Sequence, residues 1–213
     1  MIEVKSFTFN AFQENTYLIV NKESNDCLIF DPGCSNRAES DKLLRYISEN
    51  ALTPIRLINT HCHIDHVLGN KTISETYGLI LEAHHNEEAV LNSCEMVSKM
   101  YGISYDISPP IQKFIEEGDV IEMRALKLST LLIPGHSPGS ICFYDATDKF
   151  IIGGDVLFYG SIGRTDLPGG NHDDLITNIK SKLFQLPDDV VVYPGHGPQT
   201  TIGFEKLNNP FLT

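Results

Sequence analysis

The chain has 213 residues, 41% of them apolar, which is enough for a sizeable core and argues against disorder. Its 28 acidic residues outnumber the 16 basic ones, and the net charge of −12 argues against a nucleic-acid or anionic-membrane binder. No stretch reaches the roughly 18 apolar residues of a membrane span, and the first seven residues lack the order of a signal peptide. We therefore expect a cytoplasmic protein without a membrane partner.

The first half of the chain alternates strand-like runs with helical patterns. The strand-like runs are 7–9, 16–20, 27–30 and 56–60. Between the third and fourth, Leu43, Leu44 and Ile47 form one stripe within 39–50, which predicts a helix that lays one face on a sheet. The segments 67–77 and 87–100 have weaker helical patterns.

The second half repeats this style. Strand-like runs at 125–133, 140–144 and 150–152 precede a helical pattern at 173–184 and a last apolar run at 190–192. The turn-rich stretch 103–110 is the best boundary between the halves, but it is too short for a flexible linker. Sheets covered by helices predict a single α/β (α+β) domain over residues 1–213.

Four of the apolar runs end in side chains that bind metals well. Residues 56–60 lead to His61, His63, Asp65 and His66, residues 131–135 to His136, residues 151–154 to Asp155, and residues 190–195 to His196. Strands that end together present their terminal residues on one rim, so we expect these seven side chains to converge. Imidazole and carboxylate ligands suit zinc, and also iron or manganese, and such a set leaves a coordination position for water or substrate.

The run Thr60-His61-Cys62-His63-Ile64-Asp65-His66, followed by His136, Asp155 and His196, resembles the H-x-H-x-D-H pattern of the metallo-β-lactamase superfamily. The resemblance implies a four-layer αββα sandwich. It also implies that His61, His63 and His136 hold one metal, that Asp65, His66 and His196 hold a second, and that Asp155 bridges them. Asp31, in Asp31-Pro32-Gly33, would steady the site as in the family's first motif; the alternative is an aspartate that only shapes a turn.

Three further segments are similar to short bacterial proteins of the glyoxalase II type, namely 158–171, 193–198 and 209–212. Larger enzymes of that type have a helical C-terminal extension that supplies much of the glutathione site. Few residues follow His196 here, so we expect a weaker hold on glutathione.

Two divalent metals that share a water lower its pKa and can polarise a carbonyl, which favours hydrolysis. Asp65 would orient the attacking hydroxide as well as bind metal. A thioester suits such a site because a thiol, with a pKa of about 8.5, leaves as a thiolate without a strong general acid. The sequence therefore predicts a binuclear thioesterase, similar to hydroxyacylglutathione hydrolase, acting on a small thioester.

Two residues are candidate substrate contacts. Arg164 could hold a substrate carboxylate or be a solvated surface residue, and Tyr144 could line the cleft or pack in the core. The acyl group, the thiol carrier, the physiological metal and the oligomeric state stay open.

Two other reactions are compatible with this ligand set. One is a persulfide dioxygenase with a single iron held by His61, His136 and Asp155, and the other is a phosphodiesterase, which the acidic charge balance disfavours. A metal-stabilised scaffold without activity is a third reading.

Five scattered cysteines without a C-x-x-C pair predict reduced thiols rather than a disulfide framework. Cys62 alternates with His61 and His63 in extended chain, so we expect it to face away from the metal. His84 and His85 are predicted to be exposed or to cap a helix.

Overall fold

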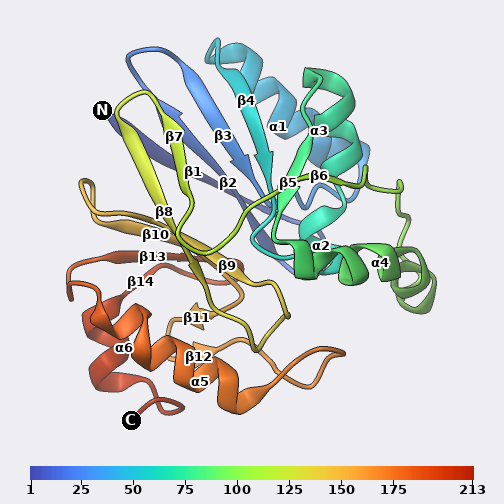
Figure 1. The fold of residues 1–213 in the computed structure, drawn as a ribbon. Coiled ribbons are helices and arrows are strands. Elements are labelled where there is room, and N and C mark those ends of the chain that lie inside the picture. The colour runs from blue at the N-terminus through green and yellow to red at the C-terminus, as the bar shows by residue number, and fades with distance from the viewer.

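The computed structural model describes residues Met1–Thr213 and contains two six-stranded sheets (Figure 1). The first sheet has the strand order β1 (Ile2–Phe9), β2 (Glu14–Asn21), β3 (Asp26–Phe30), β4 (Thr53–Ile58), β5 (Leu81–Ala83), β6 (Ile111–Phe114). The second has the order β14 (Thr200–Thr201), β13 (Val191–Pro194), β10 (Phe150–Gly154), β9 (Ile141–Asp145), β8 (Leu126–Leu132), β7 (Val120–Met123). A small hairpin, β11 (Leu157–Phe158) and β12 (Ser161–Ile162), forms a separate two-stranded sheet.

Helices cover the outer face of each sheet (Figure 1). On the first half they are α1 (Arg37–Glu49), α2 (Ile64–Val67), α3 (Asn70–Tyr77) and α4 (Glu88–Tyr101), with a 3-10 turn, η1 (His85–Glu87), before α4. On the second half they are α5 (His172–Ser181), η2 (Leu183–Gln185) and α6 (Ile202–Asn208). None of these helices combines the length and apolar character needed to cross a membrane.

Strand alternation builds three apolar layers. In β2, Tyr17 and Ile19 face the layer between the two sheets, whereas Leu18 and Val20 face the layer under the helices of the first half. In β9, Phe143 faces the layer between the sheets and Cys142 the layer under α5 and α6. The order of layers is therefore helix, sheet, sheet, helix, which confirms the predicted αββα sandwich.

Parallel strand pairs bring several loops to one edge. β3, β4 and β5 are parallel neighbours in the first sheet, and β10 and β13 are parallel neighbours in the second. Parallel neighbours end at the same edge of a sheet, so the residues after β4, and those after β10 and β13, emerge together. The two edges meet where the halves of the chain adjoin.

The predicted helix over 67–77 was wrong in its extent. It is divided into α2 and α3 at Gly69, whose N–H donates to the Pro32 carbonyl oxygen over 2.7 Å. A Cβ at Gly69 would lie 2.7 Å from that oxygen, so only glycine allows this approach. The predicted strand over 125–133 is β8 alone, preceded by β7. The short strands β5, β6, β11, β12 and β14 and the helix α6 were not predicted.

Candidate metal centre

The structure brings the seven predicted ligands together at the rim where the two halves meet. They come from the segments after four strands: His61 and His63 after β4, Asp65 and His66 at the start of α2, His136 after β8, Asp155 after β10, and His196 after β13. Each segment follows a strand of one of the two six-stranded sheets, so that sheet holds it at one end.

Three imidazoles form the first group. His63 Nδ1 lies 2.8 Å from His136 Nε2, which lies 3.2 Å from His61 Nε2. All three rings come from short turns after strands, and His61 and His136 are buried.

Asp65, His66 and His196 form the second group, and Asp155 lies between the two groups. His196 Nε2 lies 3.1 Å from Asp65 Oδ2 and 3.4 Å from Asp155 Oδ2. Asp155 Oδ2 is also 3.5 Å from His136 Nε2, and its Oδ1 is 3.5 Å from His66 Nε2. One carboxylate therefore faces both groups, which is the placement that a bridging ligand requires.

Hydrogen bonds behind the rings determine which nitrogens face the centre. His136 Nδ1 lies 2.8 Å from the carbonyl oxygen of Arg164, and His196 Nδ1 lies 3.0 Å from that of Phe12. A carbonyl oxygen only accepts, so both Nδ1 atoms carry a proton, and in each ring Nε2 is the nitrogen that faces the centre and could bind a metal.

Asp31 supports a third histidine through Thr60. The Thr60 hydroxyl donates to Asp31 Oδ2 over 2.7 Å, and the Thr60 N–H donates to Asp31 Oδ1 over 2.7 Å. Because the hydroxyl already donates its one hydrogen to Asp31, it accepts a hydrogen bond from His61 Nδ1 at 3.1 Å. Asp31 also lies 3.2 Å from His66 Nδ1, without the alignment of a hydrogen bond.

The donor set fits metal ions. His61 Nε2 and His136 Nε2 both present lone pairs 3.2 Å apart, an arrangement that a cation between them would stabilise. His66 Nε2 and Asp155 Oδ1 are buried without a hydrogen-bond partner, although buried polar atoms are normally paired. A Cβ at Gly195 would overlap Asp155 and crowd the His66 ring, so this glycine leaves the room that the ligands need.

The two groups differ in charge. Burial, followed by the neighbouring imidazoles, lowers the pKa of His63 to about 4 and the pKa of His61 well below its usual value, so both rings are neutral. Burial opposes ionisation of Asp155, but His66 and His196 outweigh it and hold its pKa well below the usual value. In the second group Asp65 and Asp155 outweigh burial, raising the pKa of His66 well above its usual value and that of His196 to about 10. A metal binds neutral imidazoles and ionised carboxylates, so binding at the second group would displace protons from these two rings.

Of the two candidate substrate residues, Arg164 adjoins this centre through its backbone carbonyl, whereas Tyr144 packs in a core layer. The Arg164 guanidinium is exposed and makes a bidentate pair with Asp166 at 2.7 Å for both bonds. Tyr144 pairs with Ile151 in β10, four residues before Asp155, and packs partly buried against the cluster under α5 and α6. The structure thus places Tyr144 in a core layer, away from the ligands, because its strand position faces the outer helices.

A second histidine cluster is hydrogen-bonded internally. His84 Nε2 and His85 Nδ1 lie 3.2 and 2.7 Å from Glu116 oxygens. His84 Nδ1 accepts from the Asn86 N–H at 3.2 Å, so Nε2 carries the proton and has no lone pair for a metal. His84 caps η1 as predicted, but it is buried, whereas His85 is exposed.

Sequence reasoning missed the Arg164 and Phe12 carbonyls and the Thr60 hydroxyl. Thr60 directly precedes His61 in the motif, which is a usable signal. No signal identifies a particular carbonyl, because every residue has one.

Residues 9–196 match the metallo-β-lactamase superfamily model, and the chain belongs to that superfamily. It is 40% identical to the probable metallo-hydrolase YqgX of Bacillus subtilis over 94% of this chain and 92% of that protein. It is 36% identical to the hydroxyacylglutathione hydrolase GloC of Haemophilus influenzae over 99% of this chain and 98% of that protein. These relatives support a metal-dependent hydrolase.

Two solved structures are similar along nearly the whole chain. BLEG-1, a B3 metallo-β-lactamase, has a TM-score of 0.89 at 33% identity, covering 99% of this chain and all of that one. TTHA1623 in a di-iron-bound form has a TM-score of 0.85 at 33% identity, covering 98% of this chain and all of that one. The His and Asp clusters in this fold indicate divalent metal binding.

Proposed function

We propose that this protein is a binuclear metal-dependent thioesterase that acts on an S-(2-hydroxyacyl)glutathione or a similar small thioester. The observation that carries the proposal is the position of Asp155, whose two oxygens lie 3.4–3.5 Å from nitrogens of both ligand groups. His61, His63 and His136 would hold one ion, Asp65, His66 and His196 the other, and Asp155 would bridge them.

The likeness to GloC supports the thioester class. It extends over 98% of that relative, so the resemblance to a hydroxyacylglutathione hydrolase concerns the whole relative and not only the metal motif. A thiol leaving group needs no strong general acid. The imidazoles at this centre would give up their free nitrogens to metal ions, and the lowered pKa values of Asp65 and Asp155 make these carboxylates poor proton donors.

When bound, two metal ions lower the pKa of a shared water and polarise a substrate carbonyl. Asp65 Oδ2 would accept a hydrogen bond from the attacking water and fix its direction. The contacts of Thr60 and of the Arg164 and Phe12 carbonyls would hold the rings of His61, His136 and His196 in their orientation for the reaction. The Arg164 guanidinium would release Asp166 and bind a substrate carboxylate in its place.

We propose zinc as the metal, with iron or manganese as alternatives. The di-iron-bound form of TTHA1623 supports the iron alternative. We place the protein in the cytoplasm, since its five cysteines are all buried and unpaired, as a reducing compartment favours. A net charge of −12 supports a small-molecule substrate rather than nucleic acid.

The test measures metal content and thiol release on the same preparation. We expect close to two transition-metal ions per chain and thiol release from S-lactoylglutathione that stops when a chelator removes them. One ion per chain with persulfide-dependent oxygen uptake would support the dioxygenase instead. Cleavage of a phosphodiester or a β-lactam, without thiol release, would likewise overturn the thioesterase.

A further inference from the structure

Glu87 is a fully buried carboxylate at the N-terminal end of α4, and it lies behind the three-histidine group. Its Oε2 accepts the Cys62 N–H over 2.7 Å. Its Oε1 accepts the Ser137 hydroxyl over 2.5 Å and the Gly139 N–H over 2.7 Å. No lysine, arginine or histidine lies within ion-pair distance of it, so all its partners are neutral.

These partners lie beside the three histidines. Cys62 stands between His61 and His63, and Ser137 directly follows His136. The two loops come from different sheets, one after β4 and the other after β8, and Glu87 contacts both. One side chain therefore connects the segments that supply all three imidazoles.

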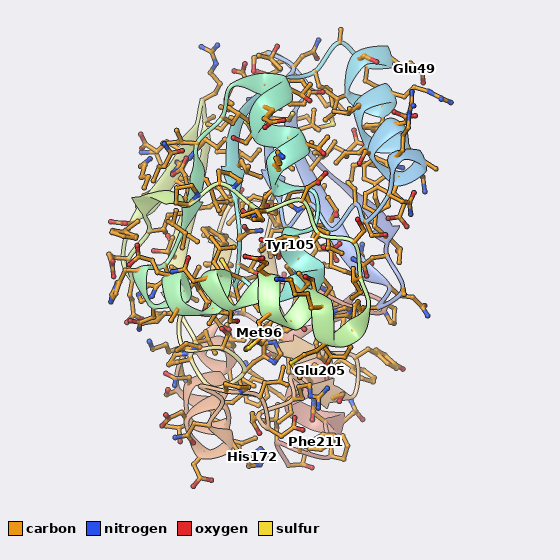
Figure 2. The ribbon with its side chains drawn as sticks, turned by 90° about the vertical axis from the view of Figure 1, so that its right-hand side faces the viewer. Glu49, Met96, Tyr105, His172, Glu205 and Phe211 are labelled. Carbon is orange, nitrogen blue, oxygen red and sulfur yellow. The ribbon has the colours of Figure 1, made fainter.

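Helix α4 holds the Cys62 residue from a second side. The Cys94 thiol, about two helical turns after Glu87, donates to the Cys62 carbonyl oxygen over 3.2 Å. Cys62 is fully buried in the cluster under the first-half helices, as expected for a residue facing away from the metal. Figure 2 shows α4 crossing the molecule where its two halves meet. A Cβ at Gly139 would lie 2.8 Å from Glu87 Cγ, so the second loop is packed directly on this carboxylate.

We infer that Glu87 is a positioning residue, which fixes the spacing between the His61–His63 turn and the His136 turn and places a buried negative charge behind the first metal. The inference rests on the proposed metal centre. A carboxylate suits this task because its two oxygens accept from three donors at once, and because its negative charge would attract a cation bound by the histidines in front of it.

Glu205 provides a matched control. It is also fully buried on a helix, α6, and it accepts from neutral donors only: the Thr200 hydroxyl, the Gly160 N–H and the Asn209 amide. It contacts neither loop that carries the three histidines. Glu87→Gln and Glu205→Gln each place an amide donor against existing donors, so both should lower the thermal midpoint of the metal-free protein.

The discriminating measurement is metal affinity, determined by competition with a chromogenic chelator. It is made in a His196→Ala background, in which the three-histidine group holds the remaining ion. We expect Glu87→Gln to weaken zinc binding roughly 10–100-fold, which is typical when a residue that orients metal ligands is replaced. Glu205→Gln should leave zinc binding unchanged. Co²⁺ bound in the same variants should show an altered visible spectrum only with Glu87→Gln.

Ser137→Ala is the milder variant if Glu87→Gln does not fold, because it removes one donor and leaves the two N–H contacts. It should weaken zinc binding by a smaller factor. Unchanged affinity and spectrum in Glu87→Gln, or in Ser137→Ala if that is the variant measured, would overturn the inference. A wild type that binds no metal would overturn the proposed function as well, whereas one that binds two ions and hydrolyses no thioester would overturn the proposed function alone.

Discussion

His136 and His196 each donate a hydrogen bond from Nδ1 to a backbone carbonyl oxygen, and this leaves Nε2 as the nitrogen that faces the centre. The side chains of Arg164 and Phe12 take no part in these bonds. Substitutions there should leave the two rings oriented, so their effects on turnover would report contacts of the side chains. Asp65 has a different role, since its own Oδ2 faces His196 at 3.1 Å and lies in the second ligand group.

Asp65→Ala should lower kcat more than it lowers metal content. The variant loses one ligand of the second ion and the group that orients the attacking water, but it leaves the three-histidine group untouched. We expect kcat for thioester hydrolysis to fall roughly 10²–10⁴-fold, the range for loss of a positioned acid–base group, while at least one ion per chain is retained.

Asp65→Asn is the control for this prediction, because the amide keeps a ligand oxygen but accepts a proton poorly. It should retain more metal than Asp65→Ala and still be slow. Wild-type kcat in either variant would show that Asp65 does not orient the nucleophile.

The turn between β8 and β9 shows how one element places a ligand. Gly135 has φ of 136° and immediately precedes His136. A Cβ there would lie 2.5 Å from the backbone nitrogen of Leu175 in α5, and the Gly135 carbonyl accepts the Asn171 N–H over 2.7 Å. The position of His136 therefore depends on close contact between its turn and the first turns of α5.

Gly135→Ala should both lower the free energy of unfolding and weaken metal binding by the three-histidine group. Strain at positive φ and the displacement of α5 each cost about 1–3 kcal/mol in unfolding free energy, which denaturant titration can measure. Gly118→Ala, with φ of 87° and nothing within 4 Å of the added Cβ, should show the strain alone and normal metal binding. Equal losses of stability in the two variants would show that the turn does not need its contact with α5.

The two halves of the molecule are joined beside the metal centre as well as through the layer between the sheets. The Tyr17 hydroxyl donates to the Pro194 carbonyl over 2.7 Å, and the Asn15 amide donates to the carbonyls of Pro194 and Gly197. Strand β2 thus holds the segment that delivers His196. Because the ligands come from both halves, metal binding should stabilise the whole structure and not one half of it.

Metal removal should lower the thermal midpoint while keeping a single transition. An ion present at 100 times its dissociation constant adds about 2.7 kcal/mol, which corresponds to roughly 5–10 °C for a chain of this size. Differential scanning calorimetry of chelated and zinc-loaded protein would measure the shift. Calcium at the same concentration is the control and should have little effect, since it prefers all-oxygen ligands. Two separate transitions, with only one sensitive to zinc, would contradict a centre shared by both halves.

The sequence by itself determined the layered fold and the set of candidate ligands. Its alternating strands, the stripe of Leu43, Leu44 and Ile47, and the H-x-H-x-D-H run are local patterns that residue spacing records directly. Tertiary structure alone decided the break at Gly69, the position of Tyr144 in a core layer, and the links from Glu87 and from two backbone carbonyls. Each of these depends on a contact between segments far apart in the chain, and a carbonyl or a buried acid looks the same in the sequence whether or not such a contact exists.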